Sequence, residues 1–288
     1  MKVVRDVRDL ERRPRAVALG TFDGVHLGHR QVLEAALATE LTPTLVTFDP
    51  HPRIALGYEV QLLSSLERRL ELIAEIGFEE ALVIEFDLEL AQVGPEEFAD
   101  EVLRPVGTEV VVAGVNFRFG RGRSGDLALL ERLGFDVRPL PLEEGVSSSR
   151  IRDLVRAGDI EQAARLLGRP YEVEGTVVAG DARGGTLGFP TANLRLDPQL
   201  LVPAYGIYAG AAEDHRAAIS IGTNPHYGGE ERRIEAHLLD FEGDLYGRRV
   251  VLQLWRRLRD EQAFADEEEL IAQIAKDVEQ TREASPPR

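Results

Sequence analysis

The sequence predicts two domains of different fold class: an α/β domain built on a parallel sheet, then a small antiparallel β-barrel with a terminal helix. Three observations lead to this prediction. At 288 residues, the chain has room for two domains of roughly 100–200 residues each. Up to about residue 142, short apolar runs alternate with amphipathic helical stretches, as a parallel sheet with crossover helices requires. Beyond Gly168, strand-like runs follow one another between loops containing Gly, Pro and Asn.

Five runs in the first half are interpreted as strands because they are short, apolar and rich in β-branched residues. They are AVALG (16–20), PTLVTFD (43–49), EALVIEF (80–86), EVVVAGV (109–115) and VRPLPL (137–142). Helical patterns separate or follow them over residues 29–40, 65–77, 95–103, 126–134, 148–158 and 159–168. Several of these patterns end near a glycine, which suits a helix C-cap.

Five runs in the second half alternate like antiparallel strands. They are YEVEGTVVAG (171–180), GIYAGAAE (206–213), HRAAISIG (215–222), RRIEAHLLDF (232–241) and RRVVLQLWRRL (248–258). The amphipathic segment at 266–282 predicts a final helix. The change of pattern places the domain boundary at residue 168, giving domains 1–168 and 169–288.

Composition excludes several classes of protein. No stretch approaches the roughly 20 apolar residues that cross a bilayer, and the charged N-terminus lacks the apolar core of a secretory signal. The chain has no cysteine, which fits the cytoplasm. A net charge of −16 disfavours binding to nucleic acid. The only lysines are Lys2 and Lys276, so a Walker A loop is impossible and a Schiff-base lysine is improbable.

The string GTFDGVHLGH (residues 20–29) lies between an expected strand and an expected helix, where parallel sheets bind ligands. Gly20 and Gly24 let the backbone turn and approach a ligand, and Gly28 leaves room beside the helix. His26 and His29 lie three residues apart on one helical face, where they could stabilise charge on a phosphoryl group. Two alternatives remain open from the residues alone: histidines that cap or pack the helix, and a metal site.

A second glycine pattern, Gly120-x-Gly122-x-x-Gly125, could indicate a dinucleotide-binding loop. Its glycines begin several residues after the expected strand end, and three arginines interrupt the approach: Arg118, Arg121 and Arg123. We therefore favour an arginine-bearing loop near phosphate.

In the second half, GDARGGTLGFPTANL (residues 180–194) combines a glycine-dense loop with two neutral oxygen donors, Thr191 and Asn193, which are expected two residues apart on one strand face. Backbone amides of such a loop can surround phosphate, and the two side chains suit a hard cation such as Mg²⁺. An ordinary hairpin loop is the alternative. Glu235 shares a strand face with Leu239 and Phe241, where partial burial would raise its pKa and suit it to proton abstraction. The residues alone favour a simpler role for Glu235, a rim carboxylate paired with an arginine.

The string at 20–29 resembles the signature of the nucleotidyltransferase superfamily, which includes cytidylyltransferases, pantetheine-phosphate adenylyltransferase and prokaryotic FAD synthetases. Class I aminoacyl-tRNA synthetases have a related motif but also need a lysine-rich loop, which this chain cannot supply. TFDPHP (47–52), GVNFRFGRGRSGD (114–126) and VSSSRIR (146–152) look like bacterial FAD synthetase motifs. The resemblance implies a Rossmann-like nucleotidyltransferase domain.

This resemblance also implies roles for individual residues. ATP would contact Gly20, Phe22, Asp23, Gly24, Ser148 and Ser149, the last of which replaces the usual threonine and keeps its hydroxyl. Arg152 would bind ATP phosphates and act with His26 and His29 in catalysis, and Asn116 would hold the flavin ring.

The motifs of the second half look like those of the riboflavin kinase domain that bacteria fuse to FAD synthetase. By this resemblance Glu235 is the catalytic base, and Thr191 and Asn193 bind the metal and ATP. ATP would also contact Gly180, Asp181, Gly184, Gly188 and Pro190. His226 departs from the family, which usually has threonine there. The similarity runs from about residue 16 to residue 283.

The implied function is a two-step synthesis of flavin coenzymes with Mg²⁺. Riboflavin and ATP give FMN and ADP, and FMN and a second ATP then give FAD and pyrophosphate. Two alternatives remain: an adenylyltransferase whose β half only binds or regulates, and a flavin or nucleotide sensor without turnover. The sequence does not indicate an oligomeric state, and no nucleic-acid or membrane partner is expected.

Overall fold

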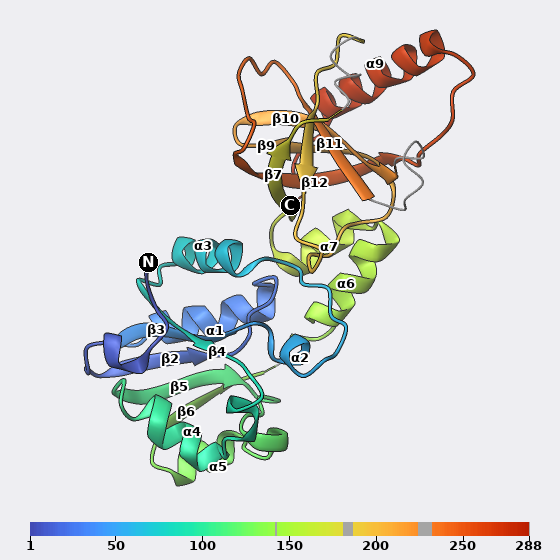
Figure 1. The fold of residues 1–288 in the computed structure, drawn as a ribbon. Coiled ribbons are helices and arrows are strands. Elements are labelled where there is room, and N and C mark those ends of the chain that lie inside the picture. The colour runs from blue at the N-terminus through green and yellow to red at the C-terminus, as the bar shows by residue number, and fades with distance from the viewer. Residues whose placement is uncertain (142, 181–186, 224–231, 288) are drawn as a thin grey trace. The chain divides into compact units, whose positions relative to one another are not determined.

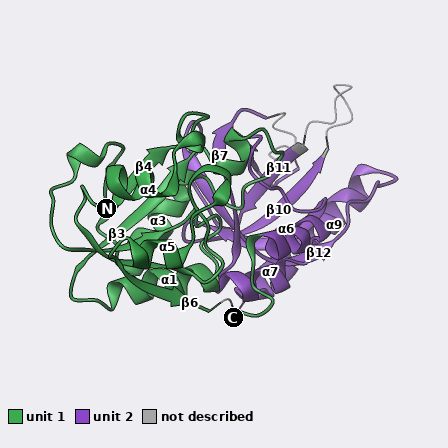
Figure 2. Cartoon of the chain, turned by 90° about the horizontal axis from the view of Figure 1, so that it is seen from below, with its two compact units in different colours: residues 1–148 green, residues 149–288 purple. Residues whose placement is uncertain are grey.

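The computed structural model describes residues 1–141, 143–180, 187–223 and 232–287. The chain divides into two compact units, residues 1–148 and residues 149–288 (Figures 1 and 2). Contacts therefore group helices α6 (Ser148–Ala157) and α7 (Ile160–Leu167) almost entirely with the second unit. The functional domain boundary at residue 168 stays a prediction, and each unit is described by itself below.

The first unit contains a six-stranded sheet in the order β1-β4-β3-β2-β5-β6, with every neighbouring pair parallel. Its strands are β1 (Lys2–Val4), β2 (Arg15–Leu19), β3 (Thr42–Asp49), β4 (Glu80–Glu85), β5 (Thr108–Gly114) and β6 (Asp136–Leu140). All five predicted strands are confirmed. The sequence did not predict β1, because it is three residues long and lies in a charged segment.

Helices cover both faces of this sheet (Figure 1). On one face, α1 (Leu27–Leu37) and α3 (Leu66–Ile76) pack against alternate residues of β2, Ala16 and Ala18. On the other face, Val17 and Leu19 pack with α4 (Pro95–Phe98), a π-helical turn (Ala99–Leu103) and α5 (Leu127–Arg132). The single helix predicted over 95–103 is thus an α-helical turn followed by a π-helical one. The short helix α2 (Pro52–Ala55) follows β3.

Strand order fixes where a ligand site belongs in this unit. From β2 the chain moves outward to β3 and β4 on one side, and it later adds β5 and β6 on the other side. The order reverses between β2 and β5, and open α/β sheets bind ligands beyond the carboxyl ends of the strands at such a point. The loop after β2 is GTFDGVHLGH, and the loop after β5 carries Asn116.

The second unit is built on a closed antiparallel barrel in the order β10-β11-β8-β7-β12-β9. Its strands are β7 (Tyr171–Val178), β8 (Ala192–Arg195), β9 (Gly206–Ala212), β10 (His215–Thr223), β11 (Arg232–Leu238) and β12 (Arg249–Arg259). The five predicted strands are confirmed, and β8 is an additional one. Alternate residues fill the interior, as Ile234, Ala236 and Leu238 do from β11, so the residues between them lie on the outer wall.

The predicted terminal helix is present as α9 (Glu267–Glu283), with Asp266 as its N-cap. Two ion pairs attach it to the barrel. Arg259 at the end of β12 makes a 2.7 Å contact with the buried Asp277, and Arg282 makes contacts of 2.7 and 2.8 Å with Asp240, which follows β11. The helix is therefore attached through charged residues near its middle and near its end.

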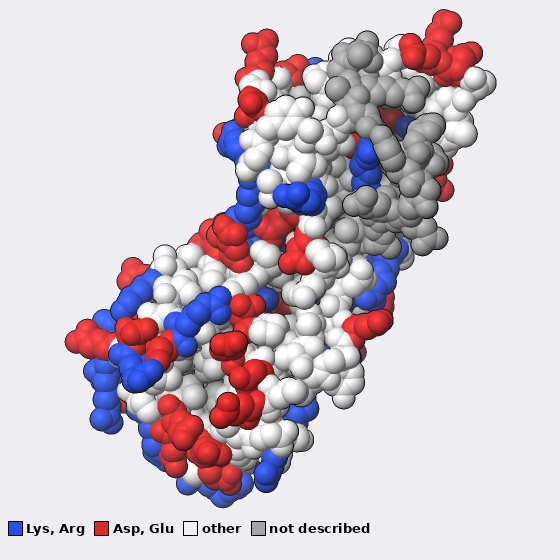
Figure 3. All heavy atoms as spheres, in the orientation of Figure 1, with Lys and Arg blue, Asp and Glu red and all other residues white. Residues whose placement is uncertain are grey.

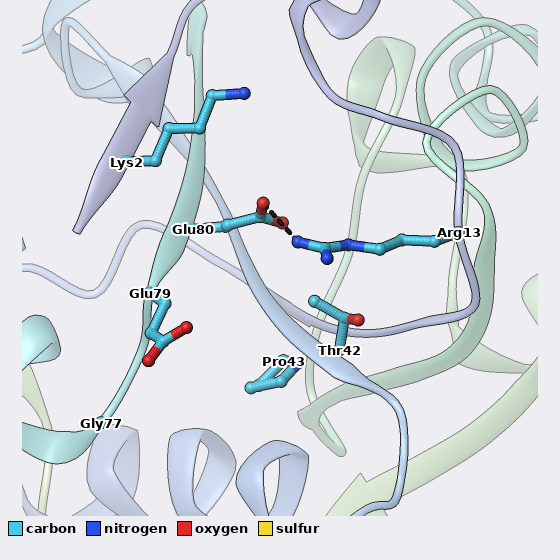
Figure 4. Close-up of a pocket in the computed structure, with 7 residues that line it drawn as sticks. All are labelled: Lys2, Arg13, Thr42, Pro43, Gly77, Glu79 and Glu80. Atoms are coloured by element: carbon cyan, nitrogen blue, oxygen red, sulfur yellow. Dashed lines mark hydrogen bonds and ion pairs between the residues drawn. The ribbon is translucent and has the colours of Figure 1, made fainter.

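No helix in the described part of the chain is both long and apolar enough to cross a membrane. On the face drawn in Figure 3, acidic and basic side chains are interspersed. A cavity of about 440 Å³ lies at the amino ends of β1, β3 and β4, where Arg13 and Glu80 point toward each other (Figure 4). This is the edge of the sheet opposite to the carboxyl ends, so the cavity is separate from the candidate site of this unit.

Candidate active sites

The loop after β2 is held in an unusual backbone conformation. Phe22, Gly24 and Val25 have φ angles of +52°, +82° and +42°, and positive φ costs a non-glycine residue free energy. Gly24 also packs closely, because a Cβ there would lie 2.7 Å from Leu63 Cδ1. Both the positive φ angle and the close packing therefore require glycine at position 24, as the sequence predicted.

Asp23, which the resemblance placed on ATP, is 1% exposed. Its carboxylate accepts hydrogen bonds from the backbone N–H groups of Leu63 at 3.0 Å and Ser64 at 3.3 Å. The Ser64 hydroxyl in turn accepts a hydrogen bond from Gly24 N–H at 3.2 Å. In this structure the Asp23 side chain therefore joins the loop to the segment before α3.

Arg69 of α3 also holds this loop through a hydrogen bond. The sequence analysis did not predict this role. It is 2% exposed, and its Nη1 donates a 2.7 Å hydrogen bond to the carbonyl of Thr21. The Thr47 hydroxyl, from the TFDPHP motif, donates to the same carbonyl at 3.4 Å. Burial lowers the pKa of Arg69, and the nearby carboxylates of Asp23 and Asp49 oppose that shift. A buried guanidinium beside two carboxylates thus fixes the loop electrostatically as well as geometrically.

The two histidines of the loop lie against each other. Their ring centroids are 3.6 Å apart with an interplanar angle of 15°. His26 is the N-cap of α1, and its Nδ1 accepts a 3.2 Å hydrogen bond from the backbone N–H of His29. The Phe22 and His29 rings meet at an interplanar angle of 67°, with 5.3 Å between their centroids. His26 therefore has the capping role that the sequence allowed, and that role uses only one of its ring nitrogens.

The other residues predicted for this site are distributed over both units. The Ser148 hydroxyl donates a 3.1 Å hydrogen bond to the carbonyl of Asp23, which joins two motifs 125 residues apart. Asn116 is exposed just beyond β5. Ser149 and Arg152 belong to the second unit, on α6, where Ser149 is exposed and Arg152 is 8% exposed. The first unit thus brings together the whole loop and Ser148.

The second glycine pattern forms a short 3₁₀ turn at Arg121–Arg123. Helix α5 begins only at Leu127, with Asp126 as its N-cap, so the glycines do not open the helix directly. Arg118, like Arg121 and Arg123, is exposed. This arrangement agrees better with the arginine-bearing loop than with a dinucleotide-binding turn.

In the barrel, Asn193 of β8 lies directly opposite Glu235 of β11 in the antiparallel register. The Thr191 hydroxyl lies 3.4 Å from Glu235 Oε2, and Arg233 makes a 3.3 Å ion pair with Glu235 Oε1. The Glu235 side chain is 30% exposed. The structure therefore brings together the three residues to which the sequence assigned metal binding and proton abstraction, and it also contains the arginine pair of the simpler interpretation.

The glycine-rich loop before β8 is described only in part. Asp181 and Gly184 lie outside the described residues, as does His226. The Asn193 side chain lies over Gly180 so closely that a Cβ there would overlap it. Gly188, with φ of +88°, and Pro190 are both exposed.

Sequence reasoning gave no role to His237. Its Nδ1 lies 2.8 Å from the carbonyl oxygen of Pro190, and its ring meets Phe189 at 84° with 5.6 Å between centroids. The segment that leads into Thr191 is thus held against β11.

A doubly wound sheet with a histidine-bearing loop and a small barrel with a Thr-Asn-Glu cluster are the two parts expected of a transferase with two centres. A family model described as FAD synthetase matches residues 9–145, and one described as riboflavin kinase matches residues 167–285. The chain belongs to the family of bifunctional riboflavin kinase/FMN adenylyltransferases.

Individual relatives match nearly the whole chain. The bifunctional riboflavin kinase/FMN adenylyltransferase of Listeria monocytogenes is 36% identical over 287 residues, covering 93% of this chain and 91% of the relative. The Escherichia coli enzyme of the same name is 36% identical over 306 residues, covering 98% and 97%. A crystal structure from Streptococcus pneumoniae, titled a macrolide-efflux protein, is 30% identical with a TM-score of 0.88 and covers 99% of each chain. The fold described above is therefore shared with a solved structure.

Proposed function

We propose that the chain makes FMN at the barrel and FAD at the sheet, with a separate set of residues for each step. Phosphorylation of riboflavin and adenylylation of FMN are the two activities of its family. Thr191, Asn193 and Glu235 would serve the first step, and the loop at 20–29 with Ser148, Ser149, Arg152 and Asn116 would serve the second. The domain boundary at 168 belongs to this proposal.

At the barrel, the nucleophile is an alcohol, which attacks the γ-phosphate more readily when a base takes its proton. Glu235 would take that proton; its position on the outer wall, partly open to solvent, supports this role. Its contacts with Thr191 and Arg233 orient the two oxygens. The 5′-hydroxyl proton would pass to Glu235 as the bond from the riboflavin oxygen to the γ-phosphorus forms and the bond from that phosphorus to ADP breaks, with ADP as the leaving group.

The residues present fit Mg²⁺ carried in with ATP. Magnesium is commonly held by few protein oxygens together with substrate phosphates, and Thr191 and Asn193 offer two such oxygens beside Glu235. The described residues contain no group of three or more acidic or histidine side chains that could hold a metal alone. When bound, the ion would neutralise charge on the β- and γ-phosphates.

At the sheet, the nucleophile is the phosphate of FMN, whose second pKa of about 6 leaves it largely ionised at neutral pH. It needs no base, so stabilisation of charge on the α-phosphate of ATP is the main requirement. The N-terminus of α1, the histidine pair and Arg152 are donors suited to that task. The observed loop fits the role because hydrogen bonds of Asp23 and Arg69 fix its backbone.

The observation that carries the proposal is the convergence of Thr191, Asn193 and Glu235 across β8 and β11. The test is to incubate the purified protein with riboflavin, ATP and Mg²⁺ and to separate the flavins by chromatography. FMN and FAD support the proposal. FAD made only from added FMN would leave the barrel a binding module, and bound but unchanged flavin would indicate a sensor. We also propose that the protein acts in the cytoplasm, which fits a sequence without cysteine.

A further inference from the structure

His237 lies two residues after Glu235 on β11, so both side chains lie on the outer wall of the barrel. Both are half-buried, while their neighbours Ile234, Ala236 and Leu238 fill the interior. One strand face therefore bears the candidate base and, one pleat further on, an imidazole for which the proposed chemistry has no use.

The contacts of His237 are directed at one short segment. A carbonyl oxygen can only accept, so the 2.8 Å contact with Pro190 means that Nδ1 carries the hydrogen and donates it. The His237 ring also packs against the Phe189 ring at an interplanar angle of 84°. Pro190 has no N–H, so its carbonyl is its only backbone hydrogen-bonding group, and His237 occupies it.

This contact bears on the site because Thr191 follows Pro190 directly. The Thr191 hydroxyl reaches Glu235 at 3.4 Å, near the upper limit for a hydrogen bond, so a small shift of the backbone would break it. Asn193 is fixed separately by its place in β8, between β7 and β11. Thr191 lies just outside that strand, and among the described residues no strand pairing of β8 includes it. The position of Thr191 thus depends on the segment that His237 holds.

We propose that His237 is a positioning residue of the kinase site: by holding Phe189 and Pro190 against β11, it places the Thr191 hydroxyl beside Glu235, where Mg²⁺-ATP is bound. The inference rests on the proposed kinase function. It assigns His237 no proton transfer. Loss of the His237 contacts with Phe189 and Pro190 should impair the use of Mg²⁺-ATP, because Thr191 belongs to the part of the site that binds the nucleotide.

The test compares three variants with the wild-type enzyme. His237→Asn keeps an amide N–H near the position of Nδ1, His237→Gln carries its amide one methylene further out, and His237→Phe keeps the ring against Phe189 but has no donor. The kcat and KM for Mg²⁺-ATP and for riboflavin are measured in FMN formation. Conversion of FMN to FAD is measured in the same preparations.

We expect His237→Phe and His237→Gln to lower kcat/KM for Mg²⁺-ATP by about 10- to 100-fold, the size of effect that a misplaced group produces. His237→Asn should recover activity to within about fivefold of wild type, since it restores the donor. KM for riboflavin and FAD formation should be unchanged in all three. Trp255, the only tryptophan in the sequence, lies in β12 and reports by fluorescence whether the barrel is folded.

Two results would overturn the inference. One is wild-type use of Mg²⁺-ATP by His237→Phe. The other is an equal loss of kcat/KM for Mg²⁺-ATP in the Asn and Gln variants while the Trp255 fluorescence stays unchanged. These two side chains carry the same amide group at different distances from the backbone. If His237→Phe does not fold, the Asn and Gln pair decides the question. A wild-type protein that makes no FMN would instead refute the proposed function.

Discussion

The hydroxyl of Thr191, at the end of the glycine-rich loop, lies 3.4 Å from Oε2 of Glu235 on β11. Glu235→Gln should keep this contact and the size of the side chain, but an amide cannot accept the proton of riboflavin. We expect FMN formation to fall by about 10²- to 10⁴-fold, the usual range for loss of a general base. Conversion of added FMN to FAD should stay unchanged. Both rates can be read from one chromatographic assay.

The control for this variant is Glu213→Gln. Glu213 is also in the barrel unit and pairs with an arginine, Arg248, at 2.7 Å, but it lies on the exposed turn between β9 and β10. Neither activity should change in this control. Equal loss of both activities in Glu235→Gln would remove Glu235 from the role of base.

The histidine pair allows the capping role to be separated from the chemical one. His29→Ala should stall the protein at FMN, with a loss of about 10²- to 10³-fold in FAD formation, as when a donor to a developing charge is removed. His26→Asn keeps an N-cap acceptor for α1 but lacks the second ring nitrogen. Normal FAD output from His29→Ala would exclude the pair from the mechanism. If His26→Asn is as active as wild type while His26→Ala is not, His26 acts only as a cap.

Arg69 should be needed for adenylylation of FMN, although it is buried behind the loop at 20–29 and is not proposed to contact a substrate. In Arg69→Met the Thr21 carbonyl loses its 2.7 Å donor, and the Asp23 and Asp49 carboxylates lose the buried positive charge. We expect FAD formation to fall at least about tenfold, since removing one partner of a buried charged group is strongly destabilising locally. FMN formation should remain.

Arg68→Met is the matched control, because Arg68 is adjacent on α3 but pairs with Glu71 at 3.0 Å and Glu75 at 3.3 Å along the helix. Its loss should leave FAD formation within about twofold, because these two ion pairs lie within α3 and such pairs contribute little. Equal effects of the two substitutions would mean that the whole helix, not the buried guanidinium, supports the loop.

The sequence predicted the fold correctly where a strand or helix was long enough to show its hydrophobic period within one continuous segment. Each predicted strand of both units is present because apolar alternation or a β-branched run marks it within a few residues. Two strands were not among the predicted runs: β1 and β8, of three and four residues, are too short for a period to emerge. A strand face was expected for Thr191 and Asn193, but only Asn193 lies within β8. Their pairing depends on distant partners, β4 for the first and β7 and β11 for the second.

The supporting residues of the sites could not be read in the same way. Arg69 did leave a signal, since it shares the apolar stripe of α3 with Leu72 and Ile73, the other buried residues of that helix. A charged residue at such a position indicates a buried partner but does not name it. The partner of His237 is the carbonyl of Pro190, 47 residues away, and a backbone carbonyl has no sequence signature.

A last prediction concerns stability, at the edge of the sheet away from the site. Arg15 is fully buried, and it donates to Glu80, to the Thr44 hydroxyl at 2.7 Å and to the carbonyl of Val106 at 2.9 Å. Glu80 also pairs with Arg13 at 2.5 Å. Glu80→Gln leaves the buried charge of Arg15 without its carboxylate, which should cost about 3–5 kcal/mol in the free energy of unfolding.

The cost should depend on pH in a defined direction. Burial alone raises the pKa of Glu80, but the hydrogen bonds and charges of Arg15 and Arg13 outweigh it and lower the pKa below the ordinary 4.5. Because folding lowers the pKa of Glu80, its ionised carboxylate contributes its full stabilisation above the ordinary value of 4.5. That contribution is lost as the pH falls through the pKa of Glu80 in the folded state. The difference between wild type and Glu80→Gln should thus be large at pH 7 and shrink below 4.5. Urea titrations followed by hydrogen exchange of the backbone amides in residues 1–148 measure this difference for the first unit, with the exposed Glu34→Gln as control. A difference independent of pH would contradict the assignment.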